Sequence, residues 1–240
     1  MANRFIEKLG CFAVLSDPDI ALLAKMTAVS RRVRARQDLI REGDRPGPVF
    51  VMLEGWACRY KILPEGGRQI IAFLMPGDTC DLHGAVLAEM DHSIQTLTPA
   101  RVASIGRLEV QELLTGHPEI ARALWTTQLI DESVLRVWIV SMGRRDSKAR
   151  VAHLICELYL RARTIGLASG DSFEMPLSQV VLADALGLTP VHMNRVLHVL
   201  RGADIIRFRR GALHIIDPTG LARIAGFDEN YLHRRLRDAA

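Results

Sequence analysis

Short apolar runs separated by turn residues occupy the chain from about residue 31 to residue 107. The runs lie at residues 49–53, 58–62, 70–74 and 102–105, and Gly, Pro and Asp fill the breaks between them. Strand-length runs at such regular spacing, with glycine-centred turns, are typical of an all-β barrel or roll. The pattern therefore predicts a β-roll in this segment, with a short helix before it at residues 19–29.

From residue 118 to residue 142 the apolar spacing becomes helical. One stripe recurs at alternating intervals of four and three residues, and it consists of Ala123, Thr127, Ile130, Val134, Val137 and Ser141. A stripe of this period forms the seam along which two helices pair, so it predicts a dimerisation helix. A helix laid on its own roll is the alternative. Gly143 to Asp146 follow as a predicted hinge, with Gly143 as the helix stop.

Two short helices joined by a glycine turn are predicted between Ser178 and Gly202. A longer amphipathic helix (147–165) and an extended stretch (173–177) come before them. Ser178 and Thr189 are favourable N-cap residues, and Pro190 takes the first helical position, where a missing N–H costs nothing. The expected inward-facing side chains are Val181, Leu182 and Ala185 in the first helix and Val196, Leu197 and Leu200 in the second. This pattern predicts a helix-turn-helix.

The second of these helices carries polar side chains that suit DNA. Thr189 and the helix N-terminus can bind a phosphate, and Arg195 can bond guanine through two hydrogen bonds. Two β runs follow at residues 205–209 and 212–216, and the arginines around their turn predict a basic wing. The predicted DNA-binding residues are Ser178, Gln179, Thr189, Pro190, Val191, His192, Asn194, Arg195, His198 and Arg209.

Charge is divided unevenly along the chain. Residues 1–143 hold 16 Lys and Arg against 17 Asp and Glu, a net of −1, whereas residues 144–240 hold 15 against 10, a net of +5; the two parts sum to +4. A basic C-terminal part favours a polyanionic partner. No run approaches the roughly 20 apolar residues that a membrane span needs. A soluble, cytoplasmic protein is therefore expected.

A β-roll, a long helix with a seam and a winged helix-turn-helix, in this order, resemble the Crp–Fnr family of bacterial transcription regulators. The resemblance covers residues 31–216. It implies an α+β fold in three parts: an effector roll at 1–117, a dimerisation helix and hinge at 118–146, and a winged helix-turn-helix domain at 147–240. It also implies a homodimer on a palindromic operator of double-stranded DNA, with RNA polymerase as a partner and an unidentified small-molecule effector.

The resemblance also implies which residues contact phosphates and which contact bases. By it, Ser178, Thr189 and His192 contact phosphates. Pro190, Val191 and Arg195 fall where the family reads bases. The members that respond to cyclic AMP have Arg-Glu in place of Pro190-Val191, so a different base preference is expected here.

The effector pocket implied by the resemblance involves Asp81, Leu82, His83, His92 and Ser93. Members that bind cyclic nucleotides hold the phosphate with an Arg-Ser pair and the ribose with a Gly-Glu pair. Here His92-Ser93 replaces the first pair, and Asp81 or Leu82 stands in place of the Glu. Because an anionic phosphate needs a fixed cation, which Arg supplies and His does not at pH 7, cyclic AMP is disfavoured. The cofactor stays unassigned.

The positions of the cysteines and histidines can also be compared with the ligand sets of iron–sulfur clusters, haem and divalent metals. Only Cys11 lies near the N-terminus, so an iron–sulfur cluster, which needs four thiolates, is set aside. Cys80 and His83 resemble the haem ligands of the carbon monoxide sensors in the family, with one extra residue between them. Asp81, His83 and His92 are an alternative set for a divalent metal. A cupin-type oxygenase with a DNA-binding tail needs more histidines than this roll holds. No catalytic motif is present, so an enzyme is not expected.

Overall fold

The computed structural model describes residues 3–82, 88–209 and 211–233. These residues form two compact units, which divide within helix α4 (Pro118–Arg144) between Asp131 and Glu132. Among the described residues, no helix combines the length and the apolarity needed to cross a lipid bilayer.

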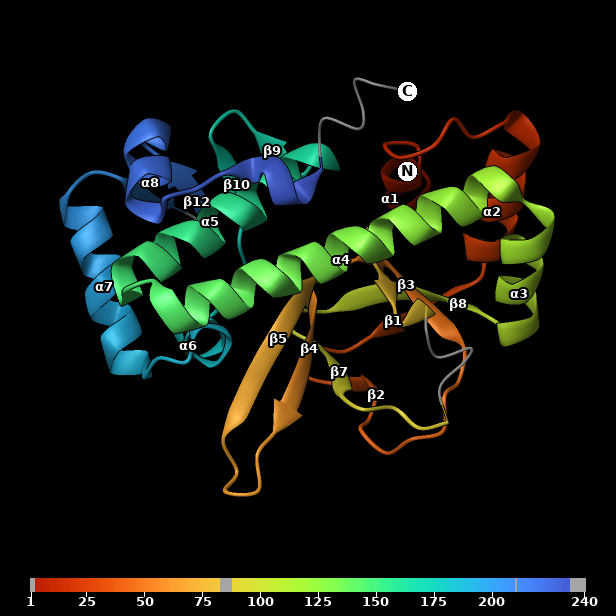
Figure 1. Ribbon diagram of the computed structural model, residues 1–240, viewed down its shortest axis with the longest axis horizontal. Coiled ribbons are helices and arrows are strands. Elements are labelled where there is room, and N and C mark those ends of the chain that lie inside the picture. The colour runs from red at the N-terminus through yellow and green to blue at the C-terminus, as the bar shows by residue number, and fades with distance from the viewer. Residues whose placement is uncertain (1–2, 83–87, 210, 234–240) are drawn as a thin grey trace. The chain divides into compact units, whose positions relative to one another are not determined.

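The N-terminal unit contains two four-stranded sheets with antiparallel pairing (Figure 1). The strand order is β1-β8-β3-β6 in the first sheet and β2-β7-β4-β5 in the second. The strands are β1 (Ser30–Val33), β2 (Asp38–Ile40), β3 (Val49–Glu54), β4 (Ala57–Ile62), β5 (Arg68–Leu74), β6 (Thr79–Cys80), β7 (Ser93–Thr96) and β8 (Ala100–Ile105). The β-roll predicted from the turn-separated apolar runs is confirmed.

Strand β3 is buried on both faces, which explains its unbroken run of apolar residues. Successive residues of a strand face opposite sides. The even-numbered residues Phe50 and Met52 therefore join a cluster that includes Ala57 and Ile94 of the other sheet. The odd-numbered residues, among them Val51, join a second cluster with the helices of this unit.

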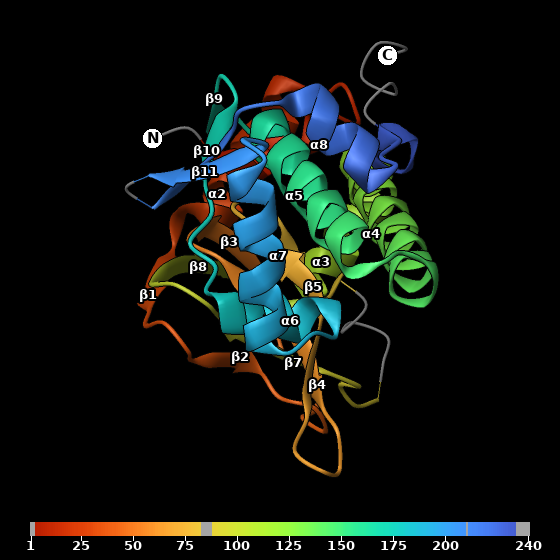
Figure 2. The ribbon, with the colours of Figure 1, turned by 90° about the vertical axis from the view of Figure 1, so that its left-hand side faces the viewer.

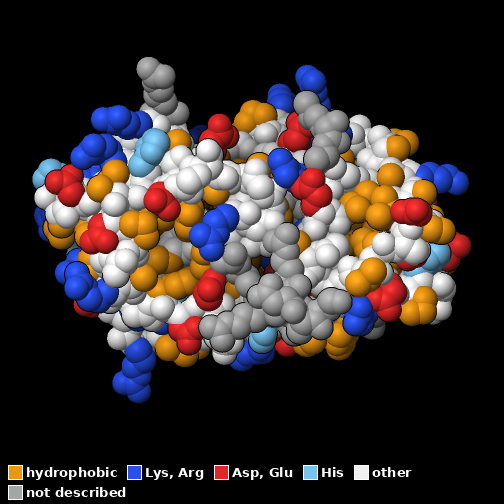
Figure 3. All heavy atoms as spheres, turned by 90° about the horizontal axis from the view of Figure 1, so that it is seen from above, with side chains coloured by type: hydrophobic (Ala, Val, Ile, Leu, Met, Phe, Trp, Pro, Cys, Tyr) orange, Lys and Arg blue, Asp and Glu red, His pale blue; other side chains and the backbone are white. Residues whose placement is uncertain are grey.

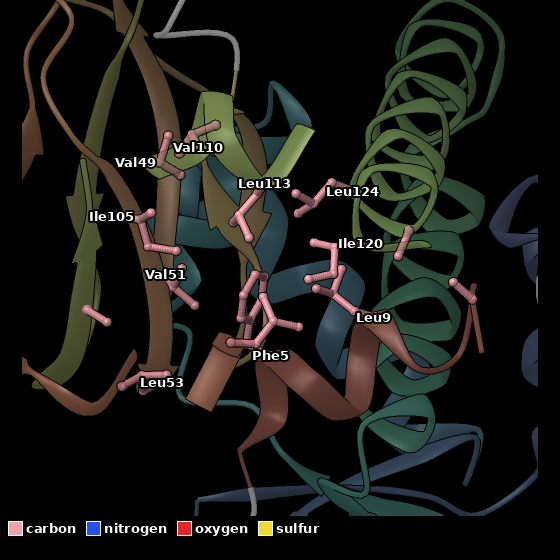
Figure 4. Close-up of a cluster of buried hydrophobic side chains, with 14 residues drawn as sticks. Phe5, Leu9, Val49, Val51, Leu53, Ile105, Val110, Leu113, Ile120 and Leu124 are labelled. Carbon is pink, nitrogen blue, oxygen red and sulfur yellow. The ribbon is translucent and has the colours of Figure 1, made fainter. Parts of the chain in front are cut away.

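This second cluster attaches the helices to the roll (Figure 4). The helices involved are α1 (Arg4–Leu9), α2 (Asp17–Ala28), α3 (Arg107–Gly116) and the first turns of α4. Phe5, Leu9 and Ile120 are buried there with Val51. The sequence predicted α2 but missed α1 and α3, because helices of six and ten residues are too short for an apolar period to stand out.

The C-terminal unit is built around α5 (Ser147–Thr164), in which residues 151–160 are all buried. The other elements are β9 (Ala168–Ser169), β10 (Ser172–Glu174), α6 (Gln179–Leu186), α7 (Pro190–Gly202), β11 (Ile206–Arg209), β12 (Ala212–Ile215), α8 (Pro218–Ala225) and a 3₁₀ turn (Glu229–Leu232). Its sheet has the order β11-β12-β10-β9. Figure 2 shows α7 with α6 beside it and the β11–β12 hairpin at its C-terminal end. The predicted winged helix-turn-helix is confirmed.

A buried carboxylate fixes the last part of α4 to α5. Glu157 is fully buried, and it accepts hydrogen bonds from Trp138 Nε1 (3.0 Å) and from the Tyr231 hydroxyl (3.1 Å). Burial raises the pKa of Glu157, against the opposing effect of Arg161, whose guanidinium lies 3.5 Å away. Helix α4 continues through Gly143 to Arg144, so the predicted stop at Gly143 is wrong, and Asp146 instead caps α5.

Candidate DNA-binding surface and effector site

The turn before α7 is shaped by a glycine and a capping threonine. Gly187 ends α6 in the left-handed region (φ +61°), where a side chain is unfavourable. Thr189 Oγ1 then accepts the backbone N–H of His192 at 3.2 Å, and Pro190 starts the helix. Ser178 caps α6 in the same way. Because a hydroxyl that accepts one hydrogen bond still carries its own O–H, both caps can donate to a phosphate.

Helix α7 has one buried face and one exposed face. The buried side chains are Met193, Val196, Leu197 and Leu200, of which the sequence had predicted all but Met193. The predicted DNA-binding residues of this segment are all exposed; they are Thr189, Pro190, Val191, His192, Asn194, Arg195 and His198. The helix is therefore anchored by its apolar side and presents polar groups to a partner.

Two predicted DNA-binding residues hold each other across the two helices. Asn194 Nδ2 donates to Gln179 Oε1 at 2.8 Å, which links α7 to the first turn of α6. The amide of Asn194 keeps its second N–H and its carbonyl oxygen for other partners. Sequence reasoning placed both residues in the surface but did not anticipate the bond between them.

The β11–β12 hairpin is the wing beside α7. Arg209 is exposed at the end of β11 and pairs in register with Ala212. Arg207 is exposed as well, and its guanidinium lies 3.0 Å from Asp204. Arg210, the third arginine of the predicted wing, lies outside the described residues. In Figure 3 basic side chains project from several places on the surface, with acidic and apolar ones between them.

The charged residues of the predicted effector pocket are bonded to one another. The Arg59 side chain on β4 is only 12% exposed, and each of its three guanidinium nitrogens donates a hydrogen bond within the chain. They donate to Asp81 Oδ1 (3.2 Å), Asp131 Oδ2 (3.3 Å) and the Thr79 carbonyl oxygen (3.2 Å). His92 Nε2 lies 2.9 Å from Asp81 Oδ2. We call Arg59, Asp81, Asp131 and His92 the Arg59 network.

The remaining predicted pocket residues also have partners within the chain. Ser93 Oγ accepts the backbone N–H of Glu42 at 3.0 Å, and Leu82 packs against the helix cluster. His83 lies outside the described residues. The Cys80 thiol is fully buried in the core between the sheets, and this burial raises its pKa, which disfavours the thiolate that haem iron takes as a ligand.

Two family models match the chain. The model of the Crp-like helix-turn-helix domain matches residues 149–224, and the model of the cyclic nucleotide-binding domain matches residues 30–117. The chain belongs to the Crp–Fnr family. This membership agrees with the order of roll, long helix and winged helix-turn-helix.

Individual relatives support the same assignment. The nitrogen fixation regulation protein FixK of Bradyrhizobium diazoefficiens is 27% identical over 89% of this chain and 90% of its own length. The transcriptional activator protein FnrL of Cereibacter sphaeroides is 25% identical over 81% of this chain and 78% of its own. The structure of FixK2 from Bradyrhizobium japonicum is similar at a TM-score of 0.74 and 22% identity, covering 83% of this chain and 98% of that one. The predicted fold is confirmed, and these sequence relatives are transcription regulators rather than enzymes.

The residues of this Crp–Fnr roll do not fit a cyclic nucleotide. A cyclic phosphate needs a cation whose charge is not already compensated, whereas the Arg59 guanidinium lies between the carboxylates of Asp81 and Asp131. Among the residues that the structure describes, no group of three or more His, Cys, Asp and Glu is arranged to hold an ion; His83 of the alternative metal set lies outside them.

The side chains of the predicted dimer seam on α4 are largely buried. Ala123, Thr127, Val134 and Ser141 are each less than a tenth exposed, and Ile130 and Val137 are half-buried. Ala123 packs in the helix cluster, and Ser141 lies beside Met142, Arg150 and His153 of the C-terminal unit. The exposed apolar side chains of α4, here called its outer face, are Trp125, Leu129, Leu135, Ile139 and Val140.

A pH-dependent stability is expected from His92. Burial lowers the pKa of His92, and Arg59 lowers it too, but hydrogen bonds and attraction from Asp81 and Asp91 outweigh both and raise it above its ordinary value. Because the folded pKa is raised, the protonated ring stabilises this unit fully below the ordinary histidine pKa of about 6.5. This contribution disappears as the pH rises through the folded pKa.

Chemical denaturation of the full chain at a series of pH values measures this effect. The free energy of unfolding is expected to decrease from pH 6 to pH 8 as His92, whose pKa is raised, loses its proton. The His92→Gln variant is expected to lack that part of the slope. An identical slope in the variant and the unaltered chain would contradict the assignment.

Proposed function

We propose that this transcription regulator is cytoplasmic and binds a palindromic operator of double-stranded DNA as a homodimer. The observation that carries the proposal is the exposed face of α7, which begins with a capped N-terminus and presents Arg195 opposite a fully buried apolar side. A helix of this kind fits the major groove with its N-terminal residues nearest the bases. The net charge of +5 in residues 144–240 supplies attraction to the phosphates.

Each residue has a proposed role in this complex. Ser178, Thr189 and His192 contact phosphates, and Arg209 of the wing lies against the sugar-phosphate backbone. Pro190, Val191 and Arg195 face the bases, with Asn194 and His198 beside them. Gln179 orients Asn194 through the hydrogen bond between their amides.

The outer face of α4 is the proposed contact between two copies. Trp125 is 64% exposed and Ile139 is 72% exposed, and both lie on the same side of the helix as Leu129. Glu132 and Arg136 lie between them and are 3.6 Å apart. An apolar stripe along a 27-residue helix is typical of a helix pair. By family resemblance, the DNA-bound dimer acts on RNA polymerase.

Selection of bound sequences from random DNA tests this function. The full chain is expected to enrich a sequence with two-fold symmetry, whose half-sites lie about 10 base pairs apart. Its affinity for that sequence should fall steeply with salt, with a slope of about −0.9 for each phosphate neutralised. Enrichment of no sequence, or of half-sites without symmetry, would contradict the proposal.

A further inference from the structure

Two members of the Arg59 network, Asp81 and His92, belong to the effector pocket that the family resemblance implies, and Arg59 lies there between two carboxylates. We propose that Arg59 replaces a diffusible effector in this chain: it fastens the roll to α4 through Asp131, so that operator binding requires no cyclic nucleotide. This inference rests on the proposed function, because its main readout is operator affinity.

The charges in the network explain why it is closed to anions. Arg59 carries a permanent positive charge, since a guanidinium is not deprotonated in proteins. A buried charge of this kind needs charged partners, and it has two, Asp81 and Asp131. An incoming phosphate would therefore lie close to two carboxylates that already compensate the single charge of Arg59. Repulsion between anions in a largely buried site makes phosphate binding there unfavourable.

The backbone at Asp81 supports the same arrangement. Asp81 has φ +55°, the left-handed region, which is unfavourable for residues other than glycine but is tolerated by Asp. Its side chain is buried and contacts both Arg59 and His92. The left-handed backbone and the two buried contacts thus occur at the same residue, and the contacts compensate the cost of that backbone conformation.

Asp131 connects the Arg59 network to the helix that leads into the DNA-binding unit. Asp131 is the last residue of the N-terminal unit, and α4 continues from it as one helix into the unit that carries α7. Arg59 belongs to β4, a central strand that pairs with both β5 and β7. The ion pair thus joins the middle of the roll to the helix at the point where the helix leaves it.

Operator binding by the full chain tests the inference. Fluorescence anisotropy measures affinity for the selected operator with no nucleotide, with cyclic AMP and with cyclic GMP. The unaltered chain is expected to bind equally well in all three. The Asp131→Asn variant is expected to bind at least about fivefold more weakly, the lower end of typical coupling between sites. Asp131→Glu, which keeps the charge, is expected to recover most of the affinity.

A matched control lies on the same helix. Glu119 also pairs with an arginine, Arg122, at 2.7 Å, but both are exposed. Glu119→Gln is expected to leave operator affinity unchanged. Circular dichroism shows whether each variant is folded. If Asp131→Asn does not fold, the operator affinity of Asp131→Glu, which keeps the carboxylate, is compared with that of the unaltered chain.

Two results would overturn the inference. One is a cyclic nucleotide that tightens operator binding of the unaltered chain by about fivefold or more. The other is an Asp131→Asn variant that binds as well as the unaltered chain. Calorimetric titration of the full chain with cyclic AMP, in the absence of DNA, is an independent test. Measurable binding of cyclic AMP would also overturn the inference. If the unaltered chain selects no DNA sequence, the proposed function fails, and the calorimetric arm still decides whether the roll takes a nucleotide.

Discussion

An Arg195→Ala chain is expected to bind its selected operator at least about tenfold more weakly than the unaltered chain. A bidentate contact between arginine and guanine contributes about 1–3 kcal/mol of discrimination, and a homodimer makes the contact once in each half-site. Arg195 is exposed on α7 and its loss removes no core contact, so the folded state should be unaffected. Binding to unrelated DNA, which depends on phosphates, should fall much less.

Arg201 provides the control for this change. It lies in the last turn of the same helix, it is exposed, and its Nε donates to the backbone carbonyl of Leu197. Arg201→Ala removes the same charge from the far end of α7, so the selected sequence is expected to stay the same. Competition between operator and random DNA measures both variants. Equal loss of specificity in the two would show that charge alone, and not the position of Arg195, determines operator choice.

The helix-turn-helix could be predicted closely because its signals are local. Capping by Ser178 and Thr189, the left-handed turn at Gly187 and the proline at the first helical position act within a few residues of one another. The β-roll was equally visible, since glycine turns and strand-length runs alternate along the segment. In both regions local preference and tertiary structure agree.

The sequence pointed to one stripe on α4, whereas the structure shows two apolar stripes along the same helix. One stripe, which includes Val134, packs within the chain, and the outer face, which includes Ile139, remains exposed. The spacing of apolar residues identifies a face that is buried. It does not distinguish burial within the chain from burial against a second copy. The helix cluster that covers Ala123 depends on α1 and α3, neither of which the sequence had revealed.

The Arg59 network could not be predicted for a related reason. Arg59 is separated from Asp81 by 22 residues and from Asp131 by 72 residues, so no local spacing connects them. Sequence reasoning identified Asp81 and His92 by resemblance to the ligand site of the family, but it looked there for a cation in the Arg-Ser position. The cation comes instead from Arg59 on β4.

Ile139→Asp is expected to convert the proposed dimer into monomers. Burying an isoleucine side chain contributes about 1.5–3 kcal/mol, and both copies lose it, which corresponds to a dimer weakened about a hundredfold or more. The new carboxylates would also face each other across the contact. Because Ile139 is 72% exposed in the single chain, its replacement should leave each copy folded. Sedimentation equilibrium over a range of protein concentrations measures the dissociation constant, and operator affinity should fall with it.

Two further variants decide which face of α4 pairs. Leu108→Asp introduces the same carboxylate at an even more exposed site, on α3 rather than on α4, and it should leave the dimer intact. Val134→Asp buries a carboxylate within the chain, so it is expected to lower the unfolding temperature in addition to any effect on pairing. A dimer that survives Ile139→Asp would remove the outer face from consideration. Loss of the dimer in Ile139→Asp but not in Leu108→Asp would place the contact between copies on the outer face. Both substitutions add a carboxylate at an exposed site, so a difference between them reflects position and not charge alone.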